Sequence, residues 1–146
     1  MFDIKLSLNW ELFSYNRKDK DSNNTTGLKH LYWELFDSPD TVGSGFRFME
    51  REPVLILDDI MVEFPSWRPT IELGYTSHTY SNLLGLVSYS PYRVGKGVRL
   101  KALNSKKRMF IVKNLILRGV DRIAISEKYI EFDTDNYLYK PNLYLR

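Results

Sequence analysis

The chain begins with a regular alternation of apolar and polar residues. Over residues 2–10 every second position is apolar, which is the period of a half-buried strand: Phe2, Ile4, Leu6, Leu8 and Trp10. Residues 16–27 (NRKDKDSNNTTG) are polar and charged without any period, and this composition predicts a linker. We therefore expect an N-terminal strand-like arm and polar linker over residues 1–27, and one domain over residues 28–146.

Three later segments have helical spacing. Residues 49–63 carry apolar side chains at that spacing, with Pro53 acceptable only near the helix start. Ser77 is a suitable N-cap for a short helix that runs to Leu84. Asn104 or Ser105 caps a third helix, which ends near Gly119. The apolar stripe expected on this third helix consists of Met109, Val112, Leu115 and Ile116.

Short strands are predicted between and after these helices. The candidate strands cover residues 69–73, 98–103, 121–126 and 129–134, and an alternating tail carries Tyr137, Tyr139, Leu143 and Leu145. Residues 37–40 (DSPD) and 43–45 (GSG) have the composition of turns. Because helices and strands do not alternate strictly, the fold class expected is α+β.

Composition excludes some classes of function. The 146 residues include no cysteine, so disulfides and cysteine-based metal sites are ruled out. The net charge of +3 is too small to indicate nucleic-acid binding. Residues 1–10 show no signal-peptide pattern, and no apolar run reaches the ~18 residues of a membrane span. We expect no membrane partner and synthesis in a cytoplasm.

Several short motifs occur in a recognisable order. Residues 72–76 (ELGYT) contain a Gly-Tyr turn, and residues 90–99 (SPYRVGKGVR) have the frame S-x-H-x-x-G-x-A-x-D. Residues 104–112 (NSKKRMFIV) and 119–125 (GVDRIAI) follow, and residues 129–133 (YIEFD) have the frame F-I-H-V-D. In this order and spacing the set resembles the zinc D-alanyl-D-alanine carboxypeptidases. The resemblance covers roughly residues 28–132.

The resemblance implies a fold and a partial loss of function. It implies a hedgehog/DD-peptidase fold, in which helices pack on an antiparallel sheet. The family's His, Asp and His zinc ligands fall at Tyr92, Arg99 and Glu131, and of these only Glu131 is a good zinc ligand. Arg99 would place a permanent cation where the metal should bind. The family's arginine near the substrate carboxylate falls at Thr76. We therefore expect no metal cofactor and no catalytic residues.

A hypothesis follows for the three substituted positions. If the fold is kept, Arg99 and Glu131 should form an ion pair with the Tyr92 hydroxyl close by. The chain has two histidines, His30 and His78, and neither matches a ligand position, so both are interpreted as surface or capping residues. Asp133 and Asp135 are a further carboxylate pair for acid–base or metal chemistry, although a turn role is the simpler interpretation of Asp135.

Three functions stay open at this point. The first is a non-catalytic structural or assembly protein, such as a bacteriophage virion component made in the host cytoplasm, because the DSPD and GSG segments resemble the opening segment of small phage members of the family. Its arm residues Ile4, Leu6, Leu8 and Trp10 would bind protein partners, including further copies of the chain. The second is a peptidoglycan-binding module that uses the old cleft. The third is an active peptidase with relocated ligands.

Overall fold

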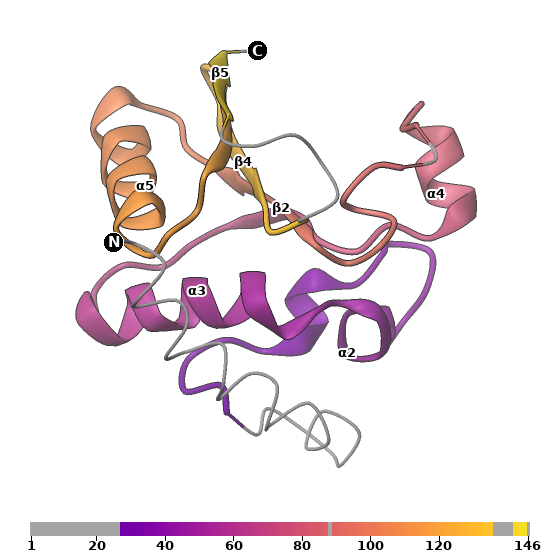
Figure 1. The fold of residues 1–146 in the computed structure, drawn as a ribbon. Helices are drawn as coiled ribbons and strands as arrows, with labels where there is room; N and C mark the ends of the chain where they lie inside the picture. Colours follow the sequence, from indigo (N-terminus) through magenta and orange to yellow (C-terminus); the bar gives the residue numbers. More distant parts are fainter. Residues whose placement is uncertain (1–26, 88, 136–141, 146) are drawn as a thin grey trace.

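A computed structural model describes residues 27–87, 89–135 and 142–145 of the chain. The proposed arm residues Ile4, Leu6, Leu8 and Trp10 lie outside the described residues, as do Tyr137 and Tyr139. The described part has the expected α+β composition (Figure 1). Its elements, in chain order, are η2 (Trp33–Phe36), α2 (Ser44–Phe48), α3 (Arg51–Glu63), β1 (Ile71–Leu73), α4 (His78–Leu83), β2 (Gly97–Lys101), α5 (Ser105–Leu117), β3 (Arg122–Ile125), β4 (Tyr129–Asp133) and β5 (Asn142–Leu145).

The five strands form one sheet in the order β1-β2-β4-β3-β5. The pairs β1–β2, β2–β4 and β3–β4 are antiparallel, as expected. Strand β5 is added to this antiparallel sheet by pairing with β3 in parallel, which the sequence analysis did not foresee. The reason lies in the register, because β4 ends beside the first residues of β3 and β5 starts at that same end. Strand β5 must therefore run in the direction of β3.

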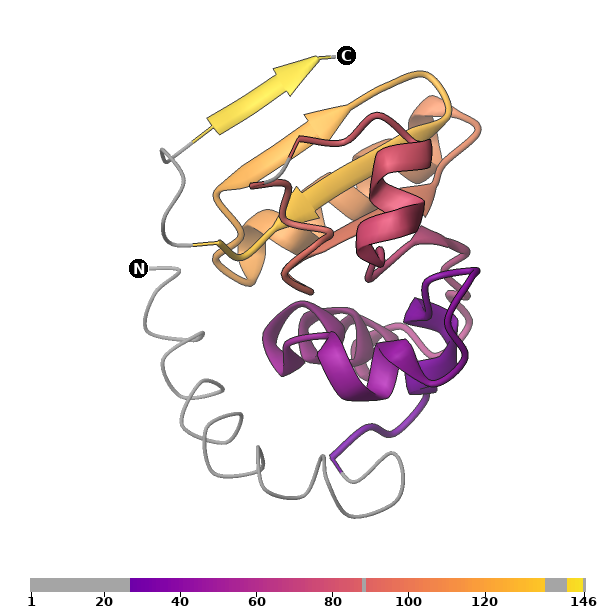
Figure 2. The ribbon, with the colours of Figure 1, turned by 90° about the vertical axis from the view of Figure 1, so that its right-hand side faces the viewer.

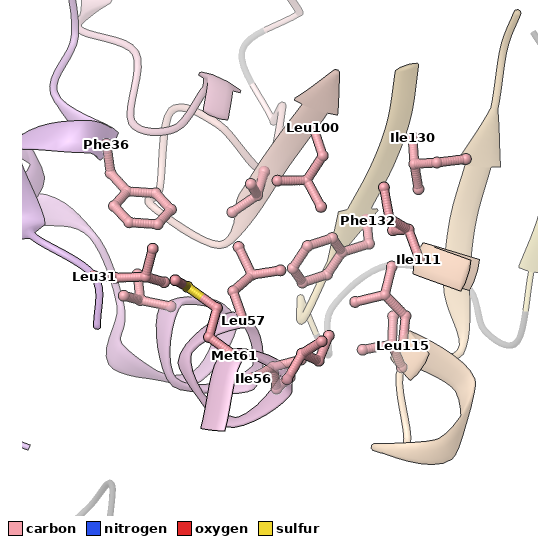
Figure 3. Close-up of a cluster of buried hydrophobic side chains, with 14 of the residues drawn as sticks. Leu31, Phe36, Ile56, Leu57, Met61, Leu100, Ile111, Leu115, Ile130 and Phe132 are labelled. Carbon is pink, nitrogen blue, oxygen red and sulfur yellow. The ribbon is translucent and has the colours of Figure 1, made fainter. Parts of the chain in front are cut away.

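Helices cover both faces of the sheet. Figure 2 shows α4 in front of the strands and α5 behind them, and Figure 1 places the same two helices on opposite sides. The hydrophobic core lies between α3, α5 and the face of the sheet that α5 covers (Figure 3). This face is built from alternate strand residues, among them Val98, Leu100, Ile130 and Phe132. The intervening residues therefore point to the α4 side of the sheet.

The helix starts agree with the capping signals. Pro53 lies in the first turn of α3, where its missing N–H costs nothing. The Ser77 side chain accepts a hydrogen bond from the Tyr80 amide at 3.0 Å, and Asn104 accepts one from the Lys107 amide at 2.8 Å. Helix α3 begins at Arg51 rather than at residue 49, and α2 forms over residues 44–48, so it includes two of the three residues 43–45 that were expected as a turn. Asp37 holds this short helix by accepting from the amides of Gly43 and Gly45.

The expected apolar stripe of α5 is partly wrong. Met109 is 68% exposed, whereas the buried residues of the helix are Ile111, Asn114 and Leu115. Directly after the helix, Arg118 is only 2% exposed. Its guanidinium donates to Asp59 Oδ2 at 2.7 Å and to the Glu63 carboxylate on α3. Two charged residues of α3 thus satisfy the buried guanidinium that follows α5, and the same guanidinium donates to Asn114 Oδ1 on α5 at 3.1 Å.

The start of the described chain is fixed to α3 by one carboxylate. Asp58 accepts hydrogen bonds from three successive backbone amides, those of Lys29, His30 and Leu31, at 2.8, 2.8 and 3.0 Å. Asp58 is buried, so these bonds form in a region with little competing water. They fix residues 29–31 to α3.

Within the described residues, no helix is long and apolar enough to cross a membrane.

Candidate functional site

The register of β2 and β4 brings two of the three predicted site residues face to face. Arg99 on β2 lies directly opposite Glu131 on β4. Their strand neighbours Val98 and Phe132 are buried in the core, so Arg99 and Glu131 occupy the other face of the sheet. Arg99 Nη2 lies 3.4 Å from Glu131 Oε1. The predicted ion pair is therefore confirmed.

Tyr92 completes this group from the loop that precedes β2. Its hydroxyl donates a hydrogen bond to Glu131 Oε2. Tyr92 is 5% exposed and Glu131 is 6% exposed, whereas 27% of the Arg99 side chain reaches solvent. The Arg99 guanidinium also lies over the ring of Tyr129, 4.3 Å from its centroid. We call Tyr92, Arg99 and Glu131 the triad.

A tight backbone contact positions the Tyr92 loop. Gly95 has a φ of +72°, a backbone conformation that residues other than glycine rarely adopt. In addition, a Cβ at this position would lie 2.1 Å from the Phe48 carbonyl oxygen. The Gly95 carbonyl in turn accepts from the Glu50 amide at 2.8 Å. The loop is thus pressed against the end of α2, and the glycine of the SPYRVGKGVR segment is required for this approach.

Burial and charge set the protonation of the triad. Burial, followed by the charge of Glu131, raises the pKa of Tyr92 well above its ordinary value. Burial disfavours the charge on Arg99, but its neighbours, Tyr92 and Glu131 above all, raise its pKa. At neutral pH Tyr92 is therefore a neutral phenol that donates its proton in a hydrogen bond, and Arg99 is a guanidinium cation.

Two further ion pairs lie beside the triad. Arg122 Nε on β3 donates to Asp133 Oδ2 at 2.9 Å, and Lys96 Nζ lies 3.9 Å from Asp135 Oδ1. Asp133 Oδ1 also accepts from the backbone amide of Asp135 at 3.0 Å, which is the geometry of a turn. Asp133 and Asp135 are thus bound to cations and backbone, which favours the turn interpretation over the acid–base one.

The triad lines an open cleft of about 310 Å³. The cleft lies on the α4 side of the sheet, and residues 85–87 and 89–92 form part of its wall. Its floor includes Arg99, Arg122, Glu131 and Asp133, so positive and negative side chains alternate along it. Arg122 was missed by the sequence analysis. The signal was present, because alternation along β3 puts Arg122 and Ala124 on the face opposite to the buried Ile123.

The other predicted positions lie away from the cleft floor. Thr76 is buried, and its hydroxyl is hydrogen-bonded to Ser81 Oγ at 2.7 Å. Its amide donates to the Tyr92 carbonyl at 3.0 Å, so Thr76 supports the loop that carries the triad tyrosine. His78 is exposed at the first position of α4, in contact with Arg93 and Asn82. His30 is exposed near Asp58. The surface interpretation of both histidines is confirmed.

The residues at the triad do not fit a zinc ion. Catalytic zinc needs three protein ligands from His, Cys, Asp or Glu, and here the single carboxylate already binds a phenol and a guanidinium. Elsewhere in the described ranges, no cluster of three or more His, Cys, Asp or Glu side chains is arranged to hold a metal. Neither a scan against protein-family models nor a search of the curated proteins found a match to this chain.

Proposed function

We propose that this chain is a non-catalytic structural or assembly protein on a degenerate zinc DD-peptidase scaffold, used as a component of a bacteriophage virion. The observation that carries this proposal is the triad. At the three positions where the resemblance expects zinc ligands, a phenol, a guanidinium and a carboxylate bind one another. The cation Arg99 neutralises the carboxylate, as the metal would in an active enzyme.

The triad also lacks the properties of a catalytic group. Tyr92 has a raised pKa, so it is a weaker acid than an exposed phenol and a poor source of a phenolate nucleophile. Arg99 remains charged at any physiological pH and does not act as a base. The chain has no cysteine, and neither of its two histidines lines the described cleft. Histidine and cysteine, two of the side chains that most often serve in proton transfer and nucleophilic attack, are thus missing from the lining of the described cleft.

Two features of the N-terminal third of the chain support the proposal. The DSPD and GSG segments, which resemble small phage members of the family, build the Asp37 contacts that hold α2. Residues 1–27 add a segment that small family members do not have, and its alternating pattern suits pairing with a partner's sheet.

Two assays test the proposal together. The purified chain, supplied with excess zinc, should not release D-alanine from a peptide that ends in D-alanyl-D-alanine. Removal of residues 1–20 should leave a folded domain, by circular dichroism and thermal unfolding, that no longer assembles. Release of D-alanine at a rate proportional to protein concentration would reject the non-catalytic proposal. Loss of folding on deletion would make the arm part of the core.

The cleft favours a second candidate, a cell-wall binding module. A volume of about 310 Å³ is enough for a short peptide, and Arg99 and Arg122 both line it. The position where the family keeps an arginine near the substrate carboxylate is Thr76, which is buried and bonded to Ser81. For this reason we place this candidate second. Sedimentation with purified peptidoglycan separates the two, because only the binding module should be retained.

A further inference from the structure

The two edges of the sheet differ in how they are covered. At the β1 edge the chain continues into Gly74 and Tyr75, and the Tyr75 amide donates to the Phe36 carbonyl of η2 at 2.9 Å. At the other edge, β5 pairs with β3 on one side, and no strand in the described residues pairs with its outer side. Backbone groups alternate in direction along a strand, so part of the N–H and C=O groups of β5 point away from β3. Such an edge is a template for a further strand.

The sequence of the chain contains a segment suited to this edge. Residues 2–10 alternate between apolar and polar positions. On β3, the strand next to β5, Ile123 and Ile125 face the core, and Arg122 and Ala124 occupy the other face of the sheet. A strand with one apolar and one polar side would continue both faces.

The segment and the edge are separated along the molecule. The described part of the chain starts at the end of the molecule opposite to β5, and α3 lies between that end and β5 (Figures 1 and 2). Asp58 fixes this start through three backbone hydrogen bonds. Residues 11–26 span about 50 Å at ~3.3 Å per residue when fully extended, more than the ~13 Å radius of gyration of a domain of this size. This length is enough for residues 2–10 to reach β5 of a second copy.

We propose that residues 2–10 of one copy pair, as an additional strand, with the outer edge of β5 in a second copy. This proposal deepens the assembly function above and rests on it. The partner surface is the backbone edge of Asn142–Leu145, and the recognition is β-strand addition. Because every copy carries both a segment and an edge, the contact repeats from copy to copy.

Cysteine cross-linking tests the contact, because the natural chain contains no cysteine. Full-length Ser7→Cys and Tyr144→Cys variants are mixed under mild oxidation, one of them with a tag, and disulfide-linked heterodimers are separated by mass. Adjacent strands lie ~4.8 Å apart, within the Cα separation of ~4.4–6.8 Å that a disulfide accepts. We expect linkage about 100-fold faster than in a mixture of Ser22→Cys, in the linker, with Tyr144→Cys. Glu72→Cys, on the β1 edge, replaces Tyr144→Cys as a second control.

Each other outcome overturns the proposal in a recognisable way. Preferred linkage to Glu72→Cys would assign the segment to the β1 edge. A linkage within one chain of the double variant Ser7→Cys/Tyr144→Cys would mean that the segment covers its own domain. If Ser7→Cys and Ser22→Cys form disulfides with Tyr144→Cys at equal rates, the segment does not contact β5. The D-alanine release assay on the unmodified chain reports on the proposed function separately, so an inactive chain without cross-links would overturn this inference only.

Discussion

The ion pair at the cleft floor leads to a prediction about energetic coupling between Arg99 and Glu131. Removing one partner of a buried ion pair costs about 3–5 kcal/mol, because the remaining charge is left in a poorly hydrated position. The Arg99 side chain is 27% exposed, and its Nη2 lies 3.4 Å from Glu131 Oε1. Arg99→Leu should therefore lower the free energy of unfolding by less, about 2–3 kcal/mol. Glu131→Leu leaves the buried Tyr92 hydroxyl without its acceptor, at a cost of about 2 kcal/mol.

The double variant separates this account from independent contributions. Arg99→Leu/Glu131→Leu leaves no uncompensated charge, so it should cost only the ~2 kcal/mol of the orphaned hydroxyl, instead of the summed ~4–5 kcal/mol. Adding Tyr92→Phe should bring the stability back to within ~1 kcal/mol of the natural chain.

Urea unfolding, followed by tryptophan fluorescence, measures these differences, and a loss of 2 kcal/mol shifts the midpoint by about 1 M. Lys101→Leu, on the exposed end of the same strand, is the control and should stay within ~0.5 kcal/mol. Single-variant costs that add within ~0.5 kcal/mol would refute the coupling.

Three further predictions concern Tyr92, Asp58 and Gly95. The pKa of Tyr92 is raised above its ordinary 10.0, so the folded state holds the phenolic proton more tightly than the unfolded state. Its contribution to stability is therefore complete below pH ~10 and is lost as pH rises towards the folded pKa, and Tyr92→Phe should make the loss of unfolding free energy from pH ~9 to ~11 less steep. An equal slope in both proteins would reject this. Asp58→Ala removes the acceptor of three amides and should cost about 2–4 kcal/mol in urea unfolding, with faster hydrogen exchange at those amides. The exposed Glu72→Ala is its control, and an equally small effect of both changes would contradict the anchoring role. Gly95→Ala should cost more than ~3 kcal/mol in thermal unfolding, because it adds a 2.1 Å clash to the strain of a positive φ. Gly85→Ala, with the same φ of +72° and open space around it, should cost only ~1–2 kcal/mol, and similar costs at the two glycines would mean that the clash is relieved.

The triad was predicted from the resemblance, which puts Tyr92, Arg99 and Glu131 at the three ligand positions of one site. Alternation along β2 and β4 fixes which face Arg99 and Glu131 share, and the frames of the two motifs place them opposite each other. The glycine of the preceding loop fixes the backbone that presents Tyr92. The contact of Gly95 with the Phe48 carbonyl, in contrast, is a tertiary relation that the sequence does not reveal.

The errors arose where distant residues decide the outcome. Met109 was assigned to the buried face of α5, but that face turns toward α3, where Asp59 and Glu63 bind Arg118 across more than fifty residues of chain. A search for apolar residues at helical spacing does not find a buried helix face that contains polar residues. The direction of β5 likewise depends on which end of β3 it meets. Helix α2 forms in a GSG segment because the Asp37 carboxylate binds its first amides.

The most direct test of the account is the zinc content of two purified proteins, measured by elemental analysis after incubation with excess zinc and desalting. The natural chain should retain no zinc, because Glu131, the only carboxylate of the triad, already accepts hydrogen bonds from Arg99 and Tyr92. The variant Tyr92→His/Arg99→Asp/Glu131→His restores the ligand set that the resemblance implies, and it should retain one zinc per chain. One zinc per natural chain would contradict the central claim, and Glu131, His30 and His78 would then be the first residues to replace.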